Sequence, residues 1–306
     1  MKVLVTGAAG YIGSIVVGEL LAAGYSVVAL DSFSTGKNSL LPFCLFPTFT
    51  FIKGDVRDAD LMARLVKKVD LIIALAALVS PQSCAGKPKQ AYEVNVQAIE
   101  LMSGLRSSTQ PLLFMSTNIG YGTREKKAVY TELDPLQPNS IYGQTKVLAE
   151  ALVSEKSGFC IYRPASAFGI SPRMQDHLLL NYYVQKAVAE NSIIIFDANF
   201  ERNFIHVRDI ARCILFTIAN WNIMKDSIYN IGISKPRLTK LDLAQLVKKY
   251  LPSINIEVRE GLTDEDGRDY CIDNRKIEDK NFHCVYSVED GIIELVKYYQ
   301  MQKIIR

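Results

Sequence analysis

The sequence has little that could hold a metal ion or a disulfide framework. Its 306 residues include three histidines and six cysteines, the latter at positions 44, 84, 160, 213, 271 and 284. No two cysteines have the CxxC spacing and the histidines are dispersed, which argues against zinc sites and disulfide scaffolds. We therefore expect no metal, and reduced cysteines as in a cytoplasmic protein.

Concentrated charge and long apolar runs are also missing. The formal net charge is +3 and there is no Lys/Arg block, so neither nucleic acid nor an anionic membrane is expected as a partner. No apolar run approaches the roughly 20 residues of a membrane span. A strand-like stretch, MKVLVTG, starts at residue 1 and leaves no room for a signal peptide, so we expect a soluble cytoplasmic protein.

The first half of the chain alternates short β-rich runs with helical patterns. Strands are predicted at KVLVT, SVVAL, TFTFI, VDLIIALAAL, PLLFMS and FCIYRP, with helices near residues 11–23, 58–66, 88–105 and 140–156. This alternation predicts βαβ units and hence an α/β fold with a Rossmann-type doubly wound parallel sheet. Runs such as LIIALAAL, which lack strict alternation, fit strands covered on both faces.

The regular alternation of predicted strands and helices ends after Pro164. Helices are predicted near residues 177–189, from Val207 onward and near 288–302, and SIYNIG is a candidate strand that rejoins the sheet. We predict a dinucleotide-binding Rossmann domain over residues 1–167 plus about 203–232. A smaller mixed α/β C-terminal lobe, over 168–202 and 233–306, would bind the substrate.

The segment VTGAAGYIG follows the first strand and opens the first helix. Gly7, Gly10 and Gly13 have the GxxGxxG spacing, a variant of the dinucleotide fingerprint. The glycines allow a tight turn, close approach of the pyrophosphate, and packing of the helix on the strand. The N–H groups at the helix start, near Tyr11 and Ile12, favour an anion.

The second strand ends in Asp31, with Ser32 beside it. A carboxylate here accepts hydrogen bonds from the adenosine ribose and would repel a 2′-phosphate, which favours NAD over NADP. The other cofactor contacts are predicted after the third and fourth strands: Asp55 and Val56 at the adenine edge, and Leu75, Ala76 and Ala77 where the backbone passes close to the cofactor.

Tyr142 and Lys146 lie four residues apart and so share one helix face. An ammonium and an oxidised nicotinamide both stabilise a phenolate, so this Tyr can remove a proton from a sugar alcohol while a hydride leaves to NAD. Thr117, at the end of the fifth strand, is the natural hydroxyl to share the substrate oxygen with Tyr142. The same YxxxK spacing at 182–186 and at 299–303 is interpreted as helix-surface pairs.

Taken in order, these motifs resemble one family over nearly the whole chain: the extended short-chain dehydrogenases/reductases of the NAD-dependent epimerase/dehydratase type, which act on nucleotide-activated sugars. The residues that carry the resemblance are VTGAAGYIG, Asp31 with STG, GDVRDAD, LAAL, STNIGYG, YGQTK, RNFIHVRD and YNIG. The resemblance implies Tyr142 as general acid/base with Lys146 and Thr117 as helpers.

The same resemblance implies contacts to the substrate and a subunit arrangement. Arg202 matches an arginine that grips the substrate diphosphate, and Asn181 and Arg268 fall where the family uses phosphate contacts. The helices near 88–105 and 140–156 would form a homodimer surface. The chain departs from the family pattern at Ala74, Asn203 and Ser166, where many members have His, Asp and Asn.

The choice of reaction depends on the residues directly after Thr117. The 4,6-dehydratases have an Asp-Glu pair there, whereas this chain has Asn118 and Ile119, which do not titrate. Asn118 can still hydrogen-bond a sugar hydroxyl. No Cys lies between residues 84 and 160, which disfavours a 3,5-epimerase. His177 is a weaker candidate for a sugar contact, and His206 is interpreted as structural.

Hydride transfer at a ring hydroxyl, with C4 as the expected position, is the reaction that these residues favour. The segments LAALVSPQSC, STNIGYG and FGISPRM resemble a subgroup that includes a GDP-heptose 4-dehydrogenase of surface-polysaccharide synthesis. A UDP-sugar 4-epimerase and a 4-keto-sugar reductase remain open, because the same Tyr, Lys and Thr serve all three. A 4,6-dehydratase and a non-catalytic dinucleotide-binding regulator are the weaker alternatives.

Overall fold

A seven-stranded parallel sheet forms the centre of the first lobe. The computed structural model describes residues 1–34, 36, 38–122, 128–260 and 269–305. The strand order is β12-β7-β5-β4-β1-β2-β3, and every neighbouring pair is parallel, which confirms the predicted doubly wound fold. The strands are β1 (Lys2–Thr6), β2 (Ser26–Asp31), β3 (Phe49–Lys53), β4 (Leu71–Ala74), β5 (Leu112–Met115), β7 (Phe159–Pro164) and β12 (Ser227–Ile231). SIYNIG therefore does rejoin the sheet, as its edge strand.

Helices cover both faces of this sheet, because successive side chains of a buried strand point to opposite sides. In β1, Val3 and Val5 pack in the core beneath α1 (Tyr11–Ala22) and α8 (Val207–Ala219). Leu4, between them, packs in a second core beneath the helices of the other face. Those helices are α2 (Ala59–Val66), α5 (Ala98–Leu105) and α6 (Ile141–Ser154).

The helix predicted near 88–105 is not uniform. It consists of α4 (Pro88–Tyr92), a π-helical segment over Glu93–Gln97 and then α5, and a short helix α3 (Pro81–Gly86) precedes it. A π-helical turn inserts extra backbone into a helix, a local geometry that apolar periodicity does not reveal. No helix in the described part of the chain is long and apolar enough to cross a membrane.

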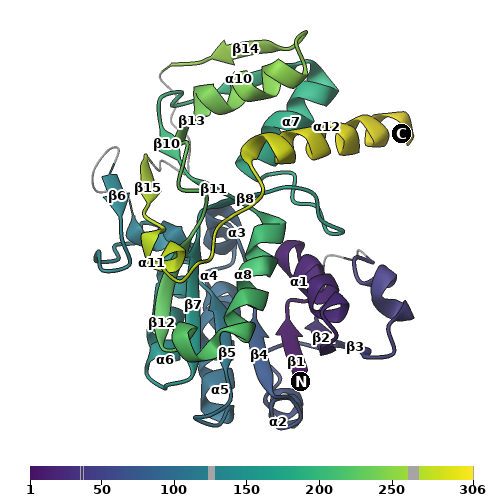
Figure 1. Cartoon of the computed structure of the whole chain (residues 1–306), viewed down its shortest axis with the longest axis vertical. Helices are drawn as coiled ribbons and strands as arrows, with labels where there is room; N and C mark the ends of the chain where they lie inside the picture. Colours follow the sequence, from purple (N-terminus) through teal and green to yellow (C-terminus); the bar gives the residue numbers. More distant parts are fainter. Residues whose placement is uncertain (35, 37, 123–127, 261–268, 306) are drawn as a thin grey trace.

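The second lobe lies beyond the carboxyl ends of the sheet strands (Figure 1). Its own apolar core joins three helices and a parallel pair of strands. The helices are α7 (Leu179–Glu190), α10 (Lys240–Tyr250) and α12 (Val288–Ile305), and the strands are β9 (Ser192–Ile195) and β14 (Asn255–Val258). A short antiparallel ribbon, β10 (Glu201–Arg202) with β13 (Leu238–Thr239), borders it.

The chain passes between the lobes several times. Two parallel pairs mark the passage: β8 (Ser166–Phe168) with β11 (Phe204–His206), and β6 (Ala128–Tyr130) with β15 (Tyr270–Ile272). Residues 270–284, predicted to belong to the second lobe, contribute Tyr270, Ile277 and Phe282 to the core of the first lobe, because these apolar side chains pack against its sheet. Otherwise the domain limits stay a prediction. The short helices are α9 (Trp221–Met224) and α11 (Arg275–Glu278), with 3-10 turns at Leu41–Leu45 and Asn118–Tyr121.

Candidate active site

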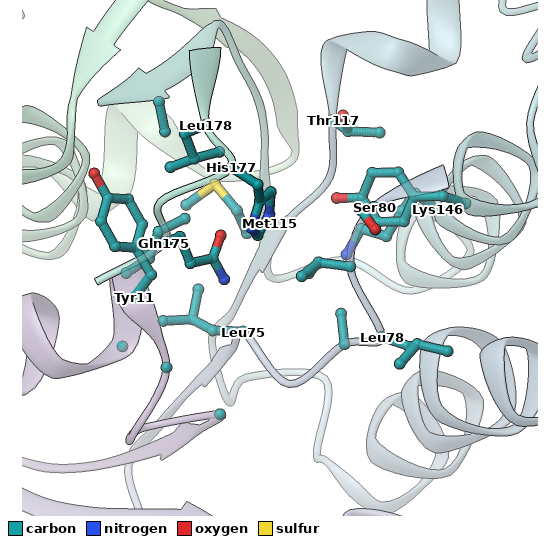
Figure 2. A pocket seen from close by; sticks show the side chains of 18 of the residues that line it. Tyr11, Leu75, Leu78, Ser80, Met115, Thr117, Lys146, Gln175, His177 and Leu178 are labelled. Atoms are coloured by element: carbon teal, nitrogen blue, oxygen red, sulfur yellow. The ribbon is translucent and has the colours of Figure 1, made fainter. Parts of the chain in front are cut away.

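A cavity of about 1090 Å³ lies between the carboxyl ends of the sheet strands and the second lobe. It crosses the point between β4 and β1 where the strand order reverses, which is where open α/β sheets bind their ligands. Tyr11 and Leu75 line one side of it, and Ser80, Thr117 and Lys146 lie together on the other (Figure 2).

The glycine loop leaves no space for side chains. Gly7 has a φ of +67°, and a Cβ added there would lie 2.7 Å from the backbone nitrogen of Ala76. A Cβ on Gly13 would lie 2.1 Å from the carbonyl oxygen of Gly7. Gly10 is the N-cap of α1 and supplies no side-chain cap, so the first N–H groups of this helix face the cavity and favour an anion. The predicted loop therefore fits a dinucleotide pyrophosphate.

Asp31 is held in place at the end of β2. Its Oδ2 accepts a hydrogen bond from the backbone N–H of Ala9 (3.0 Å), and its Oδ1 accepts one from Phe33 (2.8 Å). Each carboxylate oxygen has a second lone pair for a ribose hydroxyl. Asp31 and Ser32 both line the cavity, as do the predicted Val56, Leu75, Ala76 and Ala77.

Arg57 lines the cavity beside Asp55 and was not foreseen from the sequence. Its guanidinium contacts Asp55 (Nη2 to Oδ2, 2.6 Å) and Glu93 of the π-helical segment (Nη1 to Oε2, 2.7 Å). The hydrogen bonds from Arg57 lower the pKa of Asp55. The adjacency of Asp55 and Arg57 in GDVRDAD is a signal that sequence reading could have used.

Tyr142 and Lys146 both line the cavity from α6, whose N-cap Ser140 accepts a hydrogen bond from the N–H of Gly143 (3.1 Å). Lys146 is 3% exposed, and its Nζ lies 4.0 Å from the centroid of the Phe114 ring. Burial lowers the pKa of Lys146 to about 7, although the charges of Glu150 and Cys84 act to raise it. This ammonium therefore titrates near neutral pH.

Thr117 lies where β5 gives way to a 3-10 turn. It is buried, and its Oγ1 accepts a hydrogen bond from the N–H of Ile119 (3.2 Å), which fixes the hydroxyl at the cavity wall. Asn118 also lines the cavity, and its backbone carbonyl accepts a hydrogen bond from the Tyr270 hydroxyl (2.7 Å). The returning segment 270–284 thus supports the reactive end.

Asn95, in the π-helical segment, is a supporting residue that the sequence did not single out. Its side chain accepts from the N–H of Leu78 (2.8 Å) and donates to the carbonyl of Leu78 (3.0 Å) and to Oγ1 of Thr145 (3.0 Å). One buried amide therefore joins the loop after β4 to α6 at the position next to Lys146.

The predicted substrate contacts separate into two groups. His177 and Arg202 line the cavity together with Asn118. Burial lowers the pKa of His177, and the charge of Asp176 opposes this. Asn181 is fully buried outside the lining, where it accepts from the N–H of Gly169 (3.1 Å) and donates to the carbonyl of Gln175 (3.1 Å). Arg268 lies outside the described residues.

The two other YxxxK pairs have packing partners. Lys186 lies over the Tyr182 ring at 5.6 Å and pairs with Glu190. Tyr182 also lines the cavity from α7, which the helix-surface interpretation did not predict. The second pair differs from the prediction, because Tyr299 is buried in the second core rather than exposed and donates to Asp176 (2.8 Å). Of the three pairs, the one in α6 stands beside the end of β5.

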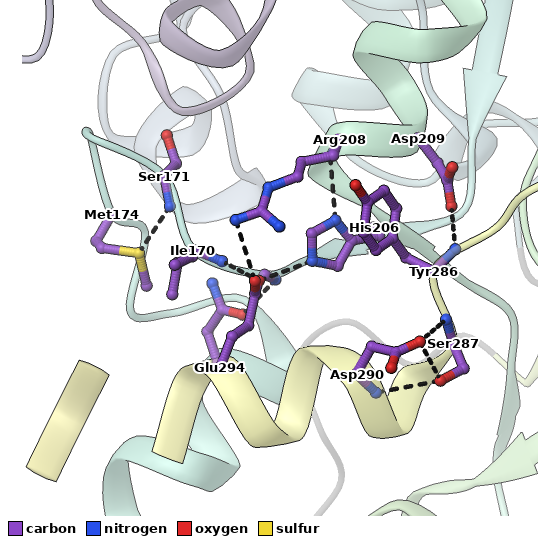
Figure 3. Close-up of polar contacts among 12 residues, drawn as sticks. Ile170, Ser171, Met174, His206, Arg208, Asp209, Tyr286, Ser287, Asp290 and Glu294 are labelled. Carbon is purple, nitrogen blue, oxygen red and sulfur yellow. Dashed lines mark hydrogen bonds and ion pairs between the residues drawn. The ribbon is translucent and has the colours of Figure 1, made fainter. Parts of the chain in front are cut away.

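His206 is buried and structural, as interpreted from the sequence. Its Nδ1 accepts from the N–H of Arg208 at the start of α8 (3.1 Å), and its Nε2 contacts Oε1 of Glu294 (2.7 Å). Figure 3 shows Glu294 reaching from α12 to the His206 ring, to Arg208 and to Ile170, whose N–H donates to Glu294 at 2.8 Å.

The bend at residues 169–171, held by Glu294, in turn holds the first turn of α1. The Tyr11 hydroxyl donates to the carbonyl of Gly169 (2.7 Å), and the Ser171 hydroxyl donates to the carbonyl of Tyr11 (2.7 Å). Ser14 and Ser171 share a further hydrogen bond of 3.0 Å. We call this set of contacts the interlobe clamp. It ties a helix of the second lobe to the glycine loop.

Comparison with known proteins agrees with this geometry. The family model described as "NAD dependent epimerase/dehydratase family" matches residues 3–232. The chain belongs to the NAD-dependent epimerase/dehydratase family. The resemblance seen in the sequence and the choice of NAD as cofactor are thereby confirmed. At this level the protein is an enzyme of the nucleotide-sugar epimerase/dehydratase class.

Individual members of the family show how far this likeness extends. The chain is 30% identical to the low-salt glycan biosynthesis protein Agl12 of Haloferax volcanii, covering 98% of both chains. It is 27% identical to a UDP-glucose 4-epimerase of Lactobacillus helveticus, covering 81% of each. The structure of DesIV, a dTDP-glucose 4,6-dehydratase of Streptomyces venezuelae with NAD and TYD bound, is 27% identical with a TM-score of 0.87, covering 100% of this chain and 98% of that one.

Proposed function

We propose that this member of the family is an NAD-dependent nucleotide-sugar 4-dehydrogenase, with a GDP-sugar of the heptose type as its first candidate substrate and a role in surface-polysaccharide synthesis. One observation carries the reaction class. Tyr142, Lys146 and Thr117 meet at one end of the cavity, and the carboxylates among its described lining residues, Asp31 and Asp55, lie at the other. The GDP-sugar rests on the resemblance of LAALVSPQSC, STNIGYG and FGISPRM.

The residues at the reactive end suffice to move one proton. Tyr142 takes the proton of the sugar hydroxyl, and Thr117 holds the same oxygen by a hydrogen bond. The proton acceptor is the Tyr142 phenolate, which becomes the neutral phenol, and the charged form of Lys146 stabilises this phenolate before the transfer. Because the pKa of Lys146 is about 7, its ammonium can release a proton near neutral pH. Bound NAD supplies the acceptor for the hydride.

Elimination of water needs a further acid and base. Asn118 stands where the dehydratase pair begins in the family, and an amide cannot transfer a proton at neutral pH. His177 supplies an imidazole to the described lining, and burial lowers its pKa, so it can accept a proton but is disfavoured as the acid that elimination also needs. The chain's own groups therefore support oxidation without dehydration.

A UDP-sugar 4-epimerase is the second candidate, favoured by the similarity to the UDP-glucose 4-epimerase of Lactobacillus helveticus. It would use the same three residues and return the hydride to the opposite face of the ketone. A 4-keto-sugar reductase would run the first step in reverse.

A panel of GDP-, UDP-, CDP- and dTDP-sugars, followed by absorbance at 340 nm and product mass, separates these reactions. We expect NADH to accumulate with a product that has lost two hydrogens. A product of unchanged mass that is a new isomer would refute the dehydrogenase and support the epimerase. Loss of water would refute the argument from Asn118, and NAD binding without turnover of any sugar would favour a regulator.

We also propose that the protein is a cytoplasmic homodimer that pairs through α4 and α6. Tyr92 and Leu148, one on each of these neighbouring helices, are 46% and 49% exposed, so both apolar side chains are available to such an interface. Light scattering should give twice the chain mass, and Leu148→Glu should reduce it to one chain. A wild-type mass of one chain would refute the dimer.

A further inference from the structure

A short ribbon places two cationic side chains on one face at the substrate side of the cavity. In the antiparallel pair of β10 and β13, Arg202 stands opposite Leu238. The backbone N–H of Lys240 donates to the carbonyl of Phe200 (3.1 Å), which continues the same pairing by one step. Residues two apart on a strand share a face, so Arg202 and Lys240 are diagonal neighbours, with Cα atoms roughly 7–8 Å apart in ideal geometry.

Both cations are buried and both line the cavity. Arg202 and Lys240 are each 2% exposed. The Lys240 Nζ donates to the carbonyl of Phe196 (3.1 Å) and lies 5.5 Å from the centroid of the Phe200 ring, so its ammonium is anchored at the cavity wall.

The position of Lys240 in its helix adds to this argument. It is the first residue of α10, at the positive end of the helix macrodipole. A cation costs stability at this end of a helix, whereas an anion bound beside it is stabilised by the lysine and by the macrodipole. Thr239 and Asp242 form the capping box of α10. Thr239 pairs with Glu201 on the other face of the ribbon, so this capping box does not lie on the face that carries Lys240.

Among the described lining residues, carboxylates come from the first lobe alone, whereas cations come from both lobes, with Arg57 and Lys146 in the first. The carboxylates, Asp31 and Asp55, come from the first lobe at the adenosine end. The charged lining residues of the second lobe are cationic: Arg173, Arg202 and Lys240. Two neighbouring cations match the two negative centres of a diphosphate better than a single carboxylate or monophosphate.

We propose that Lys240 is a substrate-binding residue which, with Arg202, holds the diphosphate of the nucleotide sugar. This inference rests on the proposed nucleotide-sugar substrate. It assigns a function to a lysine that the motifs did not single out, and it makes the β10–β13 ribbon a diphosphate site with two cations.

Isothermal titration of the full chain, using GDP, UDP, guanosine, uridine and NAD as probes, tests the proposal. Lys240→Met keeps the length of the side chain without its charge, Lys240→Arg restores the charge, and Lys249→Met removes an exposed lysine from the same helix. We expect Lys240→Met to weaken binding of the preferred nucleoside diphosphate about 10- to 100-fold, as for loss of one charged hydrogen bond. Lys240→Arg should recover most of this affinity, and Lys249→Met should match the wild type.

NAD and nucleoside binding separate a binding role from a structural one. Affinity for NAD and for the free nucleoside should be unchanged in Lys240→Met. The NAD diphosphate is expected at the glycine loop and not at the ribbon, and a nucleoside has no diphosphate. Equal diphosphate affinity in Lys240→Met and wild type would overturn the proposal. A parallel loss of NAD affinity would also overturn it, since Lys240 would then support the fold.

The same titrations distinguish the inference from the proposed function. If the wild type binds NAD and neither GDP nor UDP, the GDP-sugar and UDP-sugar candidates and the role of Lys240 all fail. If Lys240→Met loses diphosphate affinity while no sugar of the panel is converted, the ribbon site stands and the proposed reaction fails.

Discussion

Replacing Lys146 with methionine should stabilise the cofactor-free protein while it abolishes turnover. The lysine is 3% exposed beside the Phe114 ring, and its pKa is lowered by burial from 10.5 to about 7. Between these two pH values the unfolded chain holds a proton that the folded chain has lost. Unfolding then takes up one proton, so the wild-type free energy of unfolding rises with pH across this window.

The size of the effect follows from that one proton. Each pH unit changes the wild-type free energy of unfolding by about 1.4 kcal/mol. The excess stability of Lys146→Met over the wild type should therefore fall by about 3 kcal/mol between pH 7.5 and 9.5. Below pH 7 the lysine is charged in both the folded and the unfolded state, so this excess is constant, at about 5 kcal/mol. Methionine preserves the buried apolar stem, so packing changes little.

Urea unfolding of the cofactor-free proteins at several pH values measures this, with Lys89→Met, an exposed lysine on α4, as the matched control. The control should show no pH-dependent difference from the wild type. A difference between Lys146→Met and wild type that stays flat from pH 7.5 to 9.5 would refute the argument. Turnover in Lys146→Met at the wild-type rate would refute its part in proton transfer.

Three further changes test other parts of the site. Tyr142→Phe should retain NAD and lose turnover by about 10²- to 10⁴-fold, as measured with the sugar that the panel identifies; full activity would remove Tyr142 from the chemistry. Gly13→Ala should abolish NAD binding in a fluorescence titration, because its Cβ would lie 2.1 Å from a carbonyl oxygen. Gly104→Ala is the control: its Cβ would have open space, so the variant should bind NAD normally, and its free energy of unfolding should rise by up to about 1 kcal/mol. Glu294→Gln should lower the free energy of unfolding by about 1–3 kcal/mol, and Glu289→Gln, in an exposed pair on the same helix, by less than about 1 kcal/mol. Equal losses would show that the interlobe clamp contributes no more to stability than an exposed ion pair.

The predicted residues that line the first-lobe part of the cavity could be found from the sequence because their signals are local. Gly7, Gly10 and Gly13 lie within seven residues of chain and come directly after a recognisable strand. Asp31 was found by the same reasoning, since the end of the second strand of a dinucleotide-binding βαβ unit faces the ribose. Tyr142 was selected from three YxxxK pairs by its place after the fifth strand.

The supporting residues were not predictable because they act through contacts between distant parts of the chain. Asn95 reaches Leu78 and Thr145 from a π-helical turn that the apolar periodicity of residues 88–105 does not show. Residues 270–284 return to the first lobe through pairing with β6, which no local pattern marks. Lys240 becomes part of the cavity only because β13 pairs with β10.

The interlobe clamp has a consequence for any attempt to study the cofactor domain alone. A fragment that ends at residue 167 would carry every predicted NAD contact and lack Gly169, Ser171 and Glu294. The Tyr11 hydroxyl and its backbone carbonyl would lose their partners in the first turn of α1. Such a fragment would have the dinucleotide fingerprint with a loosened helix start. The unit that binds NAD as the whole enzyme does must therefore include α12.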